Sequence, residues 1–81
     1  MKNINDKIKE LTLILLYLSS WEENEMGMKY RRSWKGYDFD VLNELSEEEL
    51  INDERRSKSI SFNDSGKEKA LELLRKYDIE M

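Results

Sequence analysis

The fold of this chain is decided by residues 41 to 66, which read VLNELSEEELINDERRSKSISFNDSG. At the start of this segment, Leu42 and Leu45 stand three residues apart, which is the spacing of one face of a helix. Near its end, Ile60 and Phe62 alternate with serines, which is typical of a half-buried strand. The segment therefore predicts a helix followed by β-structure.

The predicted strand, residues 57 to 62, needs a partner. The nearest candidate is residues 50 to 53, which a turn over residues 53 to 56 would bring alongside it as a hairpin. An isolated two-stranded hairpin is only marginally stable in water. We therefore expect this hairpin to pack against helices.

A first helix is predicted from about Asn5 to Ser20, with Asn3 or Asn5 as its cap. Its apolar residues recur at helical spacing. They are Ile4, Ile8, Leu11, Leu15 and Leu18. Because the second half of this helix is apolar all round, we expect it to lie centrally, with neighbours on several sides.

A second helix should begin at Asp38, whose side chain can cap it. The sequence from Ser46 to Glu49 is also a capping-box pattern, so this helix either continues or breaks and restarts there. Residues 22 to 28 show no clear period. They predict a loop, followed by a short helical or extended piece before residue 36.

A last helix is predicted to start at residues 63 to 65, with an Asp in its first turn, where the helix dipole favours an acid. Its apolar stripe consists of Ala70, Leu73, Leu74 and Tyr77. Leu71 lies off that stripe and faces either solvent or a second subunit. The expected oligomeric state is a monomer or a weak homodimer.

This order of elements resembles a winged helix. Residues 42 to 51, the basic residues 55 to 58 and the sequence Phe62 to Gly66 are similar to the recognition helix, wing and last-helix signature of small bacterial winged-helix regulators. Residues 32 to 42 resemble a family of short, uncharacterised bacterial proteins with a domain of unknown function. The resemblance implies a mainly α fold, with three to four helices and a two-stranded wing.

Two features depart from that pattern. Glu49 stands where such proteins usually have Gly, and a left-handed backbone there would cost a non-Gly residue about 1 kcal/mol. The predicted recognition helix is also acidic. From Asp38 to Asp53 there are seven acidic side chains and no basic one, and within the helix itself Asn43 is the only residue of a base-reading type. That helix is poorly suited to recognising bases in the DNA major groove, because its acidic side chains would face the phosphates.

The composition argues against catalysis. With 81 residues the chain fits one domain, and it contains neither Cys nor His. It therefore lacks thiolate ligands, the commonest general base and any plausible serine nucleophile. No Asx-Gly loop has calcium-binding spacing. We expect no enzyme activity, no metal and no cofactor.

The longest apolar run, Leu11 to Leu18, is far shorter than the roughly 20 residues that span a bilayer. The polar N-terminal residues do not resemble a signal peptide. We therefore expect a cytoplasmic protein that does not insert into membranes.

Two short basic segments are the candidate binding sites. Residues 29 to 35 carry four basic side chains and no acid, and residues 55 to 58 form the predicted wing. The candidate nucleic-acid-binding residues are Arg31, Arg32, Lys35, Arg55, Arg56 and Lys58. The candidates for stacking or for contact with a partner are Tyr30, Trp34 and Tyr37. A structural role is the alternative for each set: Trp34 and Tyr37 would fill the core, and the wing charges would protect a hairpin edge.

Two functions remain open at this point. The first is a regulatory protein that binds double-stranded DNA through phosphate contacts of the wing. The second is a protein-interaction module that has kept the scaffold and lost DNA reading, and that uses its acidic helix or its Trp-containing segment. The first hypothesis requires both basic segments to lie on one face, where they can form a continuous track for phosphates. The second hypothesis does not require this.

Overall fold

The first element is the helix α1 (Ile4–Leu18), and the computed structural model describes residues 4–80. The predicted helix is thus confirmed, with its ends shifted by one or two residues. Asn5 lies inside α1 and does not cap it, and Asn3 lies outside the described residues. The expectation that α1 has neighbours on several sides is confirmed only in part, because the other two helices and the sheet contact it but one side stays open. One side is buried against the rest of the protein, whereas Ile8, Leu11, Leu15 and Leu18 on the other side are exposed.

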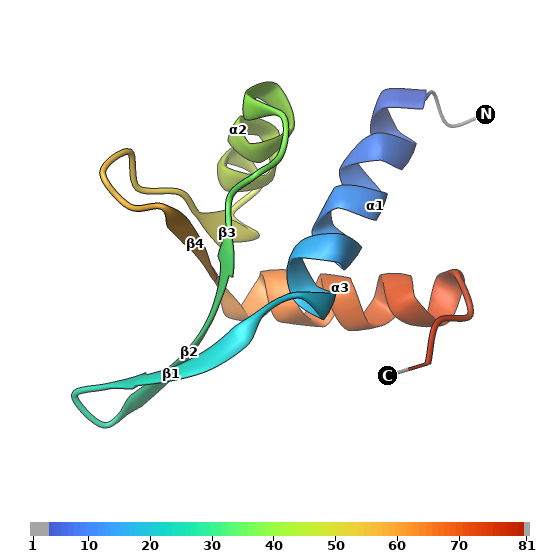
Figure 1. The fold of residues 1–81 in the computed structure, drawn as a ribbon. Coiled ribbons are helices and arrows are strands. Elements are labelled where there is room, and N and C mark those ends of the chain that lie inside the picture. Colours follow the sequence, from blue (N-terminus) through green and yellow to red (C-terminus); the bar gives the residue numbers. More distant parts are fainter. Residues whose placement is uncertain (1–3, 81) are drawn as a thin grey trace.

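The β-structure is a single antiparallel sheet. Its strands are β1 (Trp21–Glu25), β2 (Met28–Trp34), β3 (Ile51–Asn52) and β4 (Ser59–Phe62), in the spatial order β1-β2-β4-β3. β1 and β2 are joined by Met26 and Gly27, with φ of 53° and 81°. Two central residues with positive φ match the hairpin turn whose twist suits antiparallel strands. The β1–β2 hairpin extends away from the helices (Figure 1).

The expectation of a mainly α fold is wrong. Residues 4–80 form three helices and four strands, so the protein is mixed α/β. The predicted hairpin of residues 50–53 and 57–62 is confirmed, with Ile51 opposite Phe62. However, it is only half of the sheet. Where a winged helix was expected to have a loop or short helix, this chain has the β1–β2 hairpin, and no helix lies within residues 22–36.

The second helix, α2 (Phe39–Glu47), begins as predicted. The carboxylate of Asp38 accepts hydrogen bonds from the backbone N–H groups of Asp40 (2.9 Å) and Val41 (3.3 Å). The helix does not restart after Ser46. It ends at Glu47. Glu49 follows with φ of 61°, which is the left-handed conformation expected at a position where winged-helix proteins usually have Gly.

The last helix, α3 (Asp64–Lys76), begins directly after β4. Asn63 occupies the N-cap position, but its side chain makes no capping bond. Its amide instead donates to the backbone carbonyl of Glu49 at 2.7 Å. The structure thereby ties the end of α2 to the start of α3.

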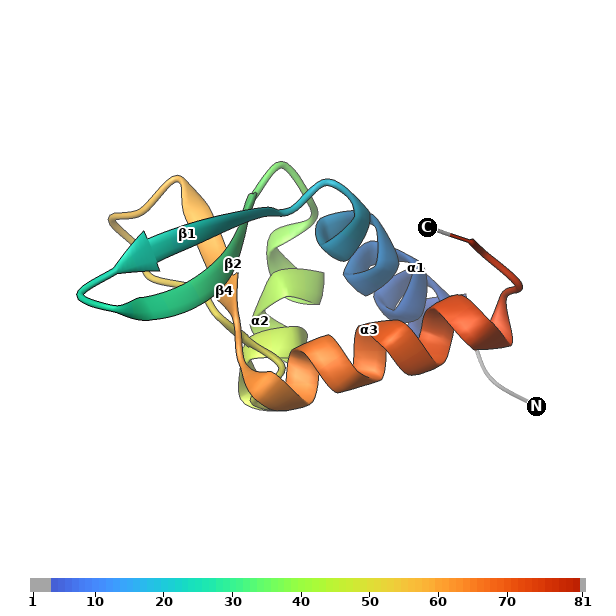
Figure 2. The same cartoon turned by 90° about the horizontal axis from the view of Figure 1, so that it is seen from below.

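The core lies between the three helices and one face of the sheet, and the helices gather at one side of the molecule (Figure 2). The predicted inward face of β4 is confirmed, because Ile60 and Phe62 are buried. Phe62 meets Tyr17 of α1 edge to face, with ring centroids 5.6 Å apart. In the part of the chain that the structure describes, the other face of the sheet is not covered by helices, and Trp34 is exposed there. It carries the residues that alternate with the buried ones.

Candidate functional site

The uncovered face of the sheet carries an aromatic pair. Successive strand residues point to opposite faces, and Ser33 of β2 is buried beside Ile60, so Arg32 and Trp34 point to the uncovered face. Trp21 of β1 lies opposite Arg32 and shares that face. The Trp21 and Trp34 ring centroids are 4.9 Å apart at 45°. Trp34 is 63% exposed, so it does not fill the core as the structural alternative expected.

Arg31 points the other way. Its guanidinium lies over the ring of Tyr17 in α1, 5.2 Å from the ring centroid. Its Nε donates to the hydroxyl of Ser20 at 2.8 Å. Arg31 therefore joins β2 to the end of α1 and does not share a face with Arg32.

Arg32 is on the uncovered face but is held by neighbours. Its Nε donates to the Ser59 hydroxyl at 3.0 Å and its NH2 group donates to the Ser57 hydroxyl at 3.3 Å. The carboxylate of Glu23 lies 3.7 Å from Nε. These contacts connect β1, β2 and β4 through one side chain.

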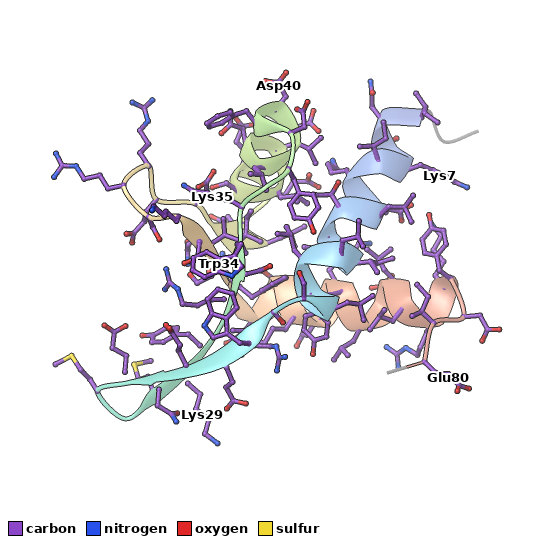
Figure 3. The ribbon with its side chains drawn as sticks, viewed as in Figure 1. Lys7, Lys29, Trp34, Lys35, Asp40 and Glu80 are labelled. Carbon is purple, nitrogen blue, oxygen red and sulfur yellow. The ribbon has the colours of Figure 1, made fainter. Side chains whose placement is uncertain are left out.

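Lys35 is similarly engaged. Its ammonium lies 2.7 Å from the Asp53 carboxylate and 2.6 Å from the backbone carbonyl of Glu54. The side chains of Lys35 and Asp53 are only 16% and 10% exposed. Figure 3 shows Lys35 next to Trp34 where the chain leaves β2. The pair fixes the base of the β3–β4 loop (residues 53–58).

The cations of the β3–β4 loop differ from Arg32 and Lys35 in their surroundings. Arg55, Arg56 and Lys58 are exposed. Among the described residues, 4–80, none provides an ion pair or hydrogen bond to these three side chains. The two basic segments thus do not form one continuous track of unpaired cations, because those of β2 and Lys35 already have partners.

The remaining aromatic candidates are less exposed than Trp34. Tyr30 is half-buried on the uncovered face, with its hydroxyl 3.5 Å from the sulfur of Met28. Tyr37 is half-buried and packs against the core cluster. Tyr37 therefore has the structural role that was its alternative.

A hollow of about 580 Å³ lies between α2 and the β3–β4 loop. It is lined by Lys35, Phe39, Asn43, Asp53 and Arg55. Phe39, the first residue of α2, is 76% exposed and was not among the predicted site residues. The missed signal is its spacing: Phe39 and Asn43 are four residues apart and share a helix face, whereas Leu42 and Leu45 face the core.

Acidic groups surround this region. A second hollow, of about 430 Å³ and with Arg32 and Tyr30 in its lining, also has Glu25, Asp53 and Glu54 in its wall. On and beside α2, five acidic residues are exposed: Asp40, Glu44, Glu47, Glu48 and Glu49. Of these, Glu48 is paired with Lys9 at 2.6 Å. Nucleic acid approaching the loop would therefore meet cations at the loop and carboxylates beside it.

Within residues 4–80, no group of His, Cys, Asp or Glu side chains is arranged to hold a metal ion. None of the helices in that range combines the length and the apolar character needed to cross a bilayer. The arrangement offers binding groups: exposed rings, one amide and three cations that have no ion-pair partner within residues 4–80.

Comparisons with known proteins give a family but no activity. No curated protein and no solved structure matches the chain. A family model described as a domain of unknown function (DUF6429) matches residues 4–80, nearly the whole chain, and the protein therefore belongs to this family.

Proposed function

We propose that the protein binds single-stranded nucleic acid at the surface formed by Trp34, Phe39, Asn43 and the β3–β4 loop. The observation that carries the proposal is the hollow between α2 and this loop, where an exposed ring, an amide and an unpaired guanidinium converge. In this proposal the β3–β4 loop serves as a wing that contacts phosphates.

The rings supply the first part of the binding. Phe39 is 76% exposed and Trp34 is 63% exposed, so each offers a face to a base. Stacking of a base on an aromatic side chain contributes about 1–3 kcal/mol and tolerates any base. Asn43 adds an amide of the kind that pairs with adenine edges.

The loop supplies the second part. Arg55, Arg56 and Lys58 have no partners among the described residues, so they can contact phosphates without breaking an internal ion pair. Three cations can hold only a few phosphates. A short single strand suits them better than a duplex, whose closely spaced charges would also face the acidic side chains of α2.

A fluorescence-anisotropy titration of a labelled single-stranded oligonucleotide, with the corresponding duplex in parallel, tests this proposal. We expect the single strand to bind more tightly. For Phe39→Ala we expect at least fivefold weaker binding, which corresponds to about 1 kcal/mol of lost stacking. For Arg55→Ala/Arg56→Ala we expect binding to depend less steeply on salt. The magnitude of the slope of log K against log salt should decrease by about 1.4, because two phosphate contacts are lost.

The control is Lys69→Ala/Arg75→Ala, which removes the same charge from α3. It should bind as the wild type does. If this variant weakens binding as much as the loop variant, the attraction comes from net charge and not from the proposed surface. If the wild type binds neither the single-stranded oligonucleotide nor the duplex at low salt, the proposal is wrong.

A second candidate function is docking on a basic protein partner. The observation that favours it is the exposed acidic face of α2, with Asp40, Glu44 and Glu47. Charge reversal at Glu44 and Glu47 distinguishes the candidates. It should strengthen binding of nucleic acid by removing repulsion, but it should weaken binding of a basic protein.

A further inference from the structure

The outward face of α1 is apolar along almost its whole length. From Ile8 to Leu18 the exposed residues of this helix are Ile8, Leu11, Leu15 and Leu18, and Ile4 extends the row by one turn. The five side chains are between 41% and 71% exposed. The residues between them, including Thr12, Leu13, Leu16 and Tyr17, are buried in the protein's own core. A surface helix normally shows the reverse pattern, with polar residues toward water.

The spacing of this row identifies what fits it. Successive residues are separated by four, three, four and three positions, which is the heptad spacing of a helix-to-helix seam. Scattered exposed leucines are common on protein surfaces, but a continuous heptad row is a packing surface for another helix.

We infer that α1 pairs with α1 of a second copy of this chain, antiparallel, about a two-fold axis near Leu11. In this arrangement Ile4 lies against Leu18 of the other copy, and Ile8 lies against Leu15. The row is nearly symmetric about Leu11, so the same residues supply both halves of the contact, as a two-fold interface requires.

The charges of α1 support antiparallel pairing with a second copy. Lys7 is the one charged side chain of α1 that is exposed. The last turn of α1 carries no basic residue to offset the negative end of the helix dipole. Antiparallel pairing brings Lys7 of one copy to the last turn of the other, at Leu15. The two helix dipoles are also opposed, which is the more favourable alignment.

The interface does not use the surface proposed for nucleic acid. The row lies on α1, whereas the proposed binding groups lie on α2, the end of β2 and the β3–β4 loop. The dimer and the proposed function can therefore fail independently.

Sedimentation of the full chain from low micromolar to millimolar concentration tests the dimer. The mass should rise from 9.8 kDa toward twice that value. Leu11→Lys/Leu15→Lys should remain at the mass of one chain, with an unchanged circular dichroism spectrum, because both side chains are exposed. Leu71→Lys is the matched control. Leu71 is 44% exposed but lies on α3, and this variant should dimerise as the wild type does.

Cross-linking tests the direction, because the chain contains no cysteine of its own. Leu11→Cys should form a disulfide with itself on oxidation. A mixture of Ile4→Cys and Leu18→Cys should give the mixed dimer in preference to either symmetric one.

Several outcomes would overturn the inference. The wild type could remain a monomer at millimolar concentration, including a monomer that binds vesicles of neutral phospholipid through this row. The Leu71 variant could lose the dimer while the α1 variant keeps it. Symmetric disulfides of Ile4→Cys would show a parallel pair instead.

Discussion

Gly66 in α3 lies directly against the backbone carbonyl of Leu50: a Cβ at position 66 would lie 1.8 Å from that oxygen. The same carbonyl accepts a hydrogen bond from the backbone N–H of Asn63 at 3.1 Å. One residue earlier, the carbonyl of Glu49 accepts from the hydroxyl of Ser65 at 2.8 Å. The start of β3 is thus fixed on the first turn of α3, and only glycine leaves room for this contact.

Gly66→Ala should therefore destabilise the protein by about 3 kcal/mol, because backbone atoms, which cannot rotate away as a side chain can, would have to move. Urea unfolding would show this as a lower midpoint with an unchanged m value. The control is Gly36→Ala, since no described residue other than its chain neighbours has an atom within 4 Å of a Cβ at that position. It should change stability by less than about 1 kcal/mol. Equal effects at the two glycines would contradict the close approach of Leu50 and Gly66.

Replacing Glu49 with glycine, the residue usual at this position in the winged-helix pattern, should stabilise the protein. With φ of 61°, its backbone is in the left-handed region, which costs a residue with a Cβ about 1 kcal/mol. Glu49→Gly should stabilise the protein by up to that amount, less the entropy that glycine adds to the unfolded chain. Glu44→Gly, at an exposed position in the interior of α2, should instead destabilise it by about 1 kcal/mol. Thermal unfolding of the pair measures both signs, and a loss of stability in both variants would count against strain at Glu49.

The sequence was informative where local chemistry decides the structure. The Asp38 cap, the left-handed Glu49 and the inward alternation of Ile60 and Phe62 each depend on a few neighbouring residues, and all three are confirmed. β1 was not predictable in the same way. Four of its five residues are exposed, so it has no apolar period, and its pairing with β2 defines it as a strand.

The candidate site was predictable in composition but not in arrangement. Arg31 and Arg32 are neighbours in sequence, yet strand geometry places them on opposite faces, and only the register against β4 decides which one faces the helices. Likewise, a helix that is apolar all round does not indicate how many neighbours cover it. The exposed row on α1 became visible only once the covering elements were placed.

The Lys35–Asp53 pair should hold the β3–β4 loop in place. Lys35→Met leaves a nearly buried carboxylate without its partner, and we expect a loss of about 2 kcal/mol in stability. The double variant Lys35→Met/Asp53→Leu should recover most of that loss, because it removes both charges. Hydrogen exchange should be faster in the loop of the single variant. If the double variant is as unstable as the single one, the cost comes from lost packing and not from the unpaired charge.

The Lys9–Glu48 pair, which joins α1 to the end of α2, should make stability depend on alkaline pH. The hydrogen bond to the Glu48 carboxylate raises the pKa of Lys9 above its ordinary 10.5, opposed in part by burial. The folded state therefore holds this proton more tightly than the unfolded state does. The resulting stabilisation is fully present below the unfolded pKa and is lost as the pH rises through the folded pKa.

Because the two side chains are 23% and 47% exposed, solvent screens the pair, and we expect its contribution to be about 0.5 kcal/mol. Urea unfolding of the wild type and of Lys9→Met across the alkaline range isolates this contribution, since the other titrating groups are common to both. The difference in unfolding free energy should be constant from neutral pH to about pH 10 and should shrink above 10.5. Glu48→Gln should remove most of this pH dependence while leaving Lys9 in place, because Glu44 and Asp6 also raise the pKa of Lys9 but less than Glu48 does. A difference that grows with rising pH would mean that the Lys9 ammonium is held less tightly in the folded state than in the unfolded one, which the 2.6 Å contact with Glu48 opposes.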